Sequence, residues 1–97
     1  MDEQADPHAD ARHLDANAVG GALMEWFGTE MTAEPGQCHH CGNVAEMGTL
    51  LAFVDAPGIV LRCSICEGVV IRIVRTPRGT MLDARGAAWI RRPAAGG

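Results

Sequence analysis

The sequence predicts a small α+β domain: an antiparallel sheet of about four strands with one N-terminal helix packed on it. Three observations support this class. Residues 14–27 carry a helical pattern, residues 47–84 read as strands separated by turns, and two Cys-x-x-Cys motifs bracket a predicted hairpin. The chain has 97 residues, which limits it to one domain.

The helical segment, residues 14–27, repeats apolar side chains at three- and four-residue steps. Gly28 follows it, where a left-handed C-cap is favoured. The pair Gly20-Gly21 lowers helix stability by roughly 1 kcal/mol per residue, so this pair either allows close packing or breaks the helix. Because the predicted strands are apolar on both faces, one face needs a cover. We expect the helix to supply it through Trp26 and Phe27.

The strand signals begin after the first cysteine motif. Residues 47–54 and 58–62 flank Ala56-Pro57-Gly58, a turn sequence, and so predict a hairpin. Residues 69–75 form the strongest strand because they are rich in β-branched side chains, and the turn at residues 76–79 leads into a fourth strand at residues 80–84. Residues 29–37 read as a linker, and Trp89-Ile90 as a last edge strand or a docking surface.

Two cysteine pairs dictate the chemistry of the chain. They are Cys38-His39-His40-Cys41 and Cys63-Ser64-Ile65-Cys66. Each Cys-x-x-Cys motif turns two sulfurs inward on a tight turn, a knuckle, and the intervening hairpin returns the chain to the same place. Four thiolates at the corners of a tetrahedron form a closed site for one structural Zn²⁺. The spacing therefore predicts a zinc ribbon with Cys38, Cys41, Cys63 and Cys66 as the metal ligands.

Other uses of the cysteines are less favoured. The chain opens Met1-Asp2-Glu3-Gln4, which is acidic where a secretory signal is basic, so we expect a cytoplasmic protein in which disulfides are rare. Thioredoxin-like redox catalysis is disfavoured because the motif occurs twice among strand-like flanks. Iron in the same site, as in rubredoxin-like electron carriers, stays open because the ligand set does not separate the two metals.

The polar residues beside the motifs have simpler interpretations. His39 and His40 could act as exchangeable ligands or proton sensors, but four thiolates already fill the tetrahedron, so we expect both side chains to point outward. Glu67 could be named a general base, yet a closed site leaves no position for a water to activate. No catalytic group is expected, and we do not expect an enzyme.

Charge divides the chain. Residues 1–37 contain eight acidic residues and one arginine, net −7, whereas residues 38–97 contain seven arginines and four acidic residues, net +3. One zinc with four thiolates adds −2 to the second part, leaving about +1. The arginines could form a nucleic-acid surface, but the weak charge and the few aromatic residues make this possible rather than favoured. No apolar run reaches the length of a membrane span, so we expect no membrane partner.

Composition also sets the expected boundaries. Residues 1–13 read as a disordered acidic leader, residues 14–92 as one zinc-ribbon domain with its N-terminal helix, and residues 93–97 as a flexible tail. A domain of this size has a small core, so we expect folding to be coupled to metal binding.

Five segments spread over the chain form a recognisable pattern. They are Leu14-Asp15-Ala16-Asn17-Ala18, Cys38-His39-His40-Cys41-Gly42, Ala56-Pro57-Gly58-Ile59-Val60-Leu61-Arg62-Cys63, Val74-Arg75-Thr76-Pro77 and Leu82-Asp83-Ala84-Arg85-Gly86. In these segments the chain resembles a family of small, uncharacterised actinobacterial proteins, a domain of unknown function with a zinc-ribbon-like pattern. That resemblance implies the fold and the metal, and no activity.

We therefore expect a protein-interaction adaptor or small regulatory subunit, with another protein as its partner. The alternatives are a nucleic-acid-binding accessory of transcription or translation and, less favoured, an iron electron carrier.

Overall fold

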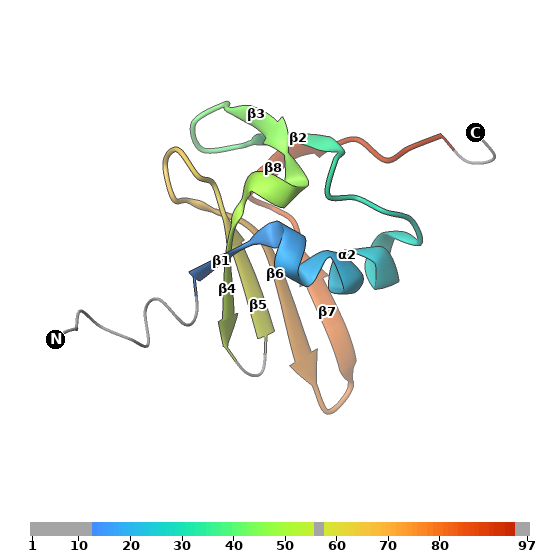
Figure 1. Cartoon of the computed structure of the whole chain (residues 1–97). Helices are drawn as coiled ribbons and strands as arrows, with labels where there is room; N and C mark the ends of the chain where they lie inside the picture. Colours follow the sequence, from blue (N-terminus) through green and yellow to red (C-terminus); the bar gives the residue numbers. More distant parts are fainter. Residues whose placement is uncertain (1–12, 56–57, 95–97) are drawn as a thin grey trace, which may run out of the picture.

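The computed structural model describes residues 13–55 and 58–94, and within them it contains one α-helix and two antiparallel sheets (Figure 1). The small α+β class is confirmed. Residues 1–12 of the predicted leader (residues 1–13), the turn positions 56–57 and the end of the tail at residues 95–97 lie outside the described residues. His13, the last residue of the predicted leader, begins strand β1.

The larger sheet has five strands in the order β1-β4-β5-β6-β7, all neighbours antiparallel. The predicted hairpin and the two strands after it form four of them, and the first is a short strand that the sequence did not reveal. The strand predicted over residues 47–54 begins only at Leu51, because residues 47–49 form a 3₁₀ helix, η2 (Met47–Thr49). Their bounds are β1 His13–Asp15, β4 Leu51–Asp55, β5 Gly58–Arg62, β6 Val69–Thr76 and β7 Gly79–Asp83.

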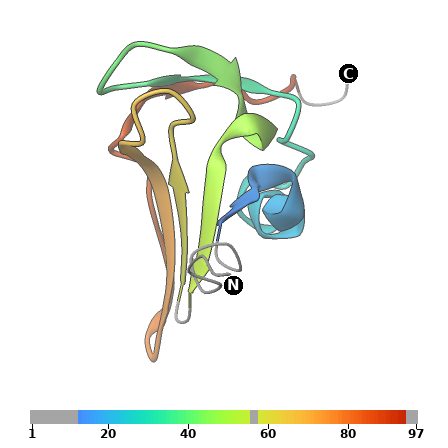
Figure 2. The same ribbon diagram turned by 60° about the vertical axis from the view of Figure 1, so that its left-hand side comes forward.

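The second sheet corrects the expectation of a single sheet. It has the order β3-β2-β8 and lies across one end of the larger sheet (Figures 1 and 2). Its strands are β2 Pro35–Cys38, β3 Val44–Glu46 and β8 Ala87–Ile90. The last three of the nine residues of the expected linker therefore lie in a central strand. Trp89-Ile90 lies in an edge strand, as one of the two interpretations had it.

The helical segment is also shorter than predicted. A 3₁₀ helix, η1 (Ala16–Val19), precedes α2 (Gly20–Phe27), so the two glycines stand at the start of the α-helix rather than in its middle. Gly28 has the expected left-handed conformation, with φ 74°, and its amide donates to the Met24 carbonyl oxygen (2.7 Å). Among the described residues, no helix is both long and apolar enough to cross a membrane.

Helix α2 lies on one face of the five-stranded sheet, as expected (Figure 2). Its buried anchor is Leu23, however, whereas Trp26 remains 41 % exposed and Phe27 is only partly buried. The core continues from this helix toward the small sheet. Its largest fully buried side chains are Leu23, Met31, Met47, Leu61, Ile71 and Cys63.

Candidate metal centre

Each cysteine pair lies in the turn between two neighbouring strands. The first knuckle, residues 38–43, joins β2 to β3, and the second, residues 63–68, joins β5 to β6. The two turns therefore come from different sheets and lie side by side at one edge of the molecule (Figure 1).

The two knuckles have the same backbone hydrogen bonds. In the first, the Cys38 amide donates to the Asn43 carbonyl and the Gly42 amide to the Cys38 carbonyl, both at 2.9 Å. In the second, the Cys63 amide donates to the Gly68 carbonyl and the Glu67 amide to the Cys63 carbonyl, again at 2.9 Å. The fifth position of each turn is left-handed, with φ 80° at Gly42 and φ 63° at Glu67. Glycine adopts that conformation freely, whereas glutamate does so at a cost.

The four predicted ligand atoms meet in space. All four Sγ atoms lie within 4.8 Å of one another. The contacts between the knuckles, Cys38 to Cys66 and Cys41 to Cys63, are both 3.7 Å. A Zn–S bond of about 2.3 Å gives a tetrahedron with an edge of about 3.8 Å, so these spacings fit a zinc ion. They are too long for a disulfide, whose sulfurs are about 2.05 Å apart, and the four thiols are free.

Backbone amides support the sulfurs of the second knuckle. The amide of Ile65 donates to Cys63 Sγ and that of Gly68 to Cys66 Sγ, both at 3.4 Å. Such bonds stabilise a thiolate, which is the form that binds a metal. The four thiols together can therefore hold one metal ion with four thiolate ligands.

The pKa values of two thiols move in opposite directions. The Asn43 amide lowers the pKa of Cys41, but partial desolvation and the neighbouring thiols outweigh it and raise the pKa to about 11. Burial raises the pKa of Cys63, whereas the amides of Cys66 and Ile65 and two neighbouring thiols lower it to about 7. Cys63 thus ionises far more readily than its neighbour Cys41. A cation in the centre would favour the thiolate form of all four cysteines.

The histidines of the first knuckle behave differently from each other. His39 is exposed as expected, and its backbone amide donates to the Gly86 carbonyl (2.8 Å). His40 reaches the other knuckle: its Nε2 donates to the Val69 carbonyl oxygen at 3.0 Å. A Cβ at Gly68 would come within 2.5 Å of the His40 ring, so the ring lies against this glycine. His40 is exposed as well, so both side chains lie at the surface as expected, and the bond from His40 to Val69 is the feature that the sequence did not predict.

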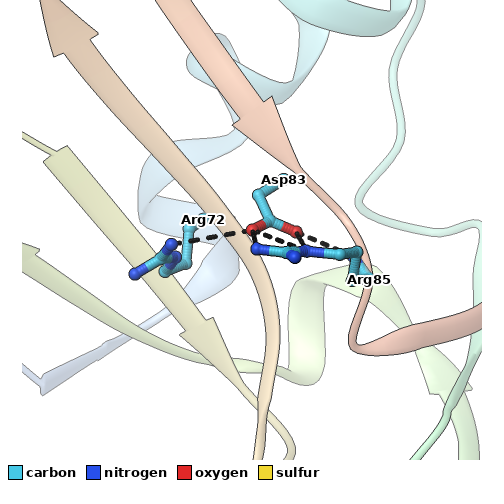
Figure 3. A network of polar contacts seen from close by, with 3 residues as sticks. All are labelled: Arg72, Asp83 and Arg85. Atoms are coloured by element: carbon cyan, nitrogen blue, oxygen red, sulfur yellow. Dashed lines mark hydrogen bonds and ion pairs between the residues drawn. The ribbon is translucent and has the colours of Figure 1, made fainter.

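Most of the arginines in the second half of the chain bind within the protein. Arg72 and Arg85 flank the Asp83 carboxylate, with Arg85 in a two-point contact (2.7 and 3.1 Å) and Arg72 at 3.6 Å (Figure 3). Arg85, through its side chain and its amide, and more weakly Arg72 hold the pKa of Asp83 well below its usual range. This network was not predicted from the sequence, in which Asp83 and Arg85 stand two residues apart but Arg72 lies on the preceding strand.

Three other arginines bind polar groups of the protein, two of them far away in the chain. Arg91 pairs with Glu34 at 3.3 Å, and Arg92 Nε donates to the Phe27 carbonyl at the end of α2 (2.9 Å). Arg62 Nη1 donates to the Glu67 carbonyl in the second knuckle (2.9 Å). Among the described residues, Arg75 and Arg78 are the arginines whose side chains have no such partner.

A comparison with models of protein families identifies one family. The model of a family of unknown function, DUF6510, matches residues 9–95. The chain belongs to that family. The family expectation from the sequence is thereby confirmed, whereas an actinobacterial origin stays a prediction. Searches of curated proteins and of solved structures found no match.

Proposed function

We propose that the protein is a zinc-ribbon-like binding module in which Cys38, Cys41, Cys63 and Cys66 hold one structural Zn²⁺. The observation that carries this proposal is the meeting of four sulfurs, all within 4.8 Å of one another and two pairs at 3.7 Å, from two knuckles with the same backbone hydrogen bonds. When bound, the ion would stabilise the fold rather than take part in a reaction, because four protein ligands leave no open coordination position for a substrate or water. The rest of the domain then acts by binding, as a protein-interaction adaptor or a small regulatory subunit.

A groove beside α2 supports a protein partner. It has a volume of about 230 Å³ and lies between the helix and residues of strands β4, β5, β6 and β7. Trp26, Val54, Ile59 and Ile73 give it apolar walls, and the first two of these side chains are about 40 % exposed. Exposed tryptophan next to an aliphatic groove is typical of residues that dominate protein interfaces. We expect a partner to insert one large apolar side chain here.

The arginines favour a protein partner over nucleic acid. Five of the seven in the second half of the chain bind carboxylates or backbone carbonyls of the protein itself. Only Arg75 and Arg78 among the described residues are left for a phosphate backbone, which is few for tight binding without sequence preference. Cytoplasmic location is part of the same proposal.

Metal analysis tests the first half of the proposal. Gently purified protein should contain one zinc per chain, and Cys38→Ser should lower that content severely, whereas His39→Ala should leave it unchanged. A red, iron-loaded protein would favour the electron carrier instead. Zinc well below one per chain, with no other metal, would contradict the metal assignment.

Affinity purification from the native host, with nuclease added, tests the second half. A partner of the groove should be lost with Trp26→Ala and retained with Met24→Ala, a matched change at an exposed residue of the same helix outside the groove. Retention with both variants would place the interface elsewhere. Loss of all captured material on nuclease treatment would favour the nucleic-acid alternative.

A further inference from the structure

The four sulfurs are not equivalent to solvent. Cys38 is 5 % exposed and Cys63 1 % exposed, whereas Cys41 and Cys66 are exposed. Each knuckle therefore contributes one buried and one exposed thiol. The two 3.7 Å contacts pair them across the knuckles: exposed Cys66 with buried Cys38, and exposed Cys41 with buried Cys63.

The surroundings leave the exposed pair open to small reagents. Ser64, Ile65 and Glu67 on the second knuckle are exposed, and Ile65 is 69 % exposed. On the first knuckle, His39 and Gly42 are also exposed. A small oxidant in water can therefore reach Cys41 and Cys66 directly, while their partners are protected but in contact.

We propose that this cluster is a reversible oxidation site, at which a peroxide converts the four thiolates into two disulfides across the knuckles, Cys38–Cys66 and Cys41–Cys63, and releases the metal. The proposal rests on the metal site of the proposed function. It adds an oxidation reaction and a specific pairing of the four cysteines, neither of which follows from the proposed metal site by itself.

The chemistry balances for each pair. The exposed thiolate attacks hydrogen peroxide, so an S–O bond forms, the O–O bond breaks, and a sulfenic acid and hydroxide result. The buried thiolate then attacks that sulfur; an S–S bond forms, the S–O bond breaks, and a second hydroxide leaves. Two sulfurs give up two electrons to one peroxide. Two pairs use two peroxides, and Zn²⁺ leaves without changing its oxidation state.

Distance and stability favour the cross-knuckle pairing. A sulfur at 3.7 Å must approach by about 1.7 Å to form a disulfide, which side-chain rotation can supply. Disulfides across the knuckles keep the two turns joined after the metal leaves, and a small domain depends on such a link. Disulfides within each Cys-x-x-Cys motif would separate the turns instead. Disulfides across the knuckles therefore make the oxidation reversible with the fold retained.

Trypsin separates these outcomes cleanly. It cuts after Arg12, Arg62 and Arg72, so residues 13–62 carry Cys38 and Cys41 while residues 63–72 carry Cys63 and Cys66. Full-length zinc-loaded protein is treated with hydrogen peroxide, blocked with an alkylating agent and digested without reduction. Cross-knuckle disulfides join the two peptides, whereas disulfides within the knuckles leave them separate. Fragmentation of the joined peptides then assigns each partner.

We expect about two peroxides consumed per zinc released, the two peptides joined, and full recovery of zinc binding after dithiothreitol and added zinc. Met81, which is 50 % exposed, serves as the control, and its sulfoxide should appear only at higher peroxide doses. Separate peptides with internal disulfides, or sulfinic acids without zinc recovery, would overturn the proposal. Zinc content before treatment scores the metal site independently, so the two proposals can fail separately.

Discussion

Replacing Glu67 with glycine should stabilise the protein, because Glu67 holds the left-handed position that Gly42 fills in the first knuckle. Its φ of 63° makes it the only non-glycine residue with positive φ among those described. The left-handed conformation costs an ordinary residue roughly 1–2 kcal/mol. Glycine avoids this cost but gives up about 0.4–1 kcal/mol to the greater freedom of its unfolded chain. The net expected gain for Glu67→Gly is about 0.5–1 kcal/mol, or roughly 2–8 °C in Tm.

Thermal unfolding of the zinc-loaded protein, with zinc kept in excess, measures this gain. Glu67→Ala is the matched control: it removes the same carboxylate but keeps a Cβ in the left-handed position, so it should gain little. The reverse change, Gly42→Ala, should lower Tm because it adds that cost to the first knuckle. The backbone argument fails if Glu67→Ala stabilises as much as Glu67→Gly, since the carboxylate rather than the backbone would then be responsible.

Other outcomes follow from the contacts around the knuckles. His40→Ala should lower stability by about 0.5–1 kcal/mol and keep the metal, because it removes the bond to Val69, whereas His39→Ala should be neutral in urea unfolding. Because the pKa of Asp83 is lowered in the folded protein, its ionised carboxylate contributes to stability above its unfolded pKa of about 3.9, and this contribution is lost as the pH falls below that value. The free energy of unfolding, measured from pH 7 to pH 2, should therefore fall less steeply in Asp83→Asn than in the natural sequence. A chelator should increase amide hydrogen exchange in β2, β3 and β8 before it does so in β5 and β6; simultaneous exchange of both sheets would argue against this order. Gel-shift titrations should detect no oligonucleotide binding tighter than about 1 μM at physiological salt, and nanomolar binding would overturn the adaptor proposal.

The sequence predicted the large sheet well because its signals are local. The strand at β6 is rich in β-branched residues, and the turn at residues 76–79 is followed by the expected partner strand β7. Each Cys-x-x-Cys motif likewise fixes its own turn locally, and the expectation that the four sulfurs cluster is confirmed. These are features in which a few neighbouring residues determine the structure.

The small sheet escaped prediction because its pairing is not local. Pro35–Cys38 pairs with Val44–Glu46 on one side and with Ala87–Ile90 on the other, across about fifty residues of chain. A four-residue run containing proline and glycine carries little strand signal of its own. Met31 was likewise placed in a linker, yet it is fully buried. In both cases contacts between distant parts of the chain determine the structure, and the local sequence pattern does not reveal it.

The same non-local arrangement gives the proposed metal a structural role. The first knuckle is part of the small sheet and the second is part of the large sheet, so an ion bound by all four sulfurs would tie one sheet to the other. Contacts between the two halves that do not need the ion include the His40 bond to Val69 and the close approach of the His40 ring to Gly68. The small sheet has strands of only three or four residues, and sheets so short depend on packing against a neighbour for stability. We therefore expect the proposed metal to stabilise the small sheet by fixing it to the larger one, and its loss or the proposed oxidation to act first at that junction.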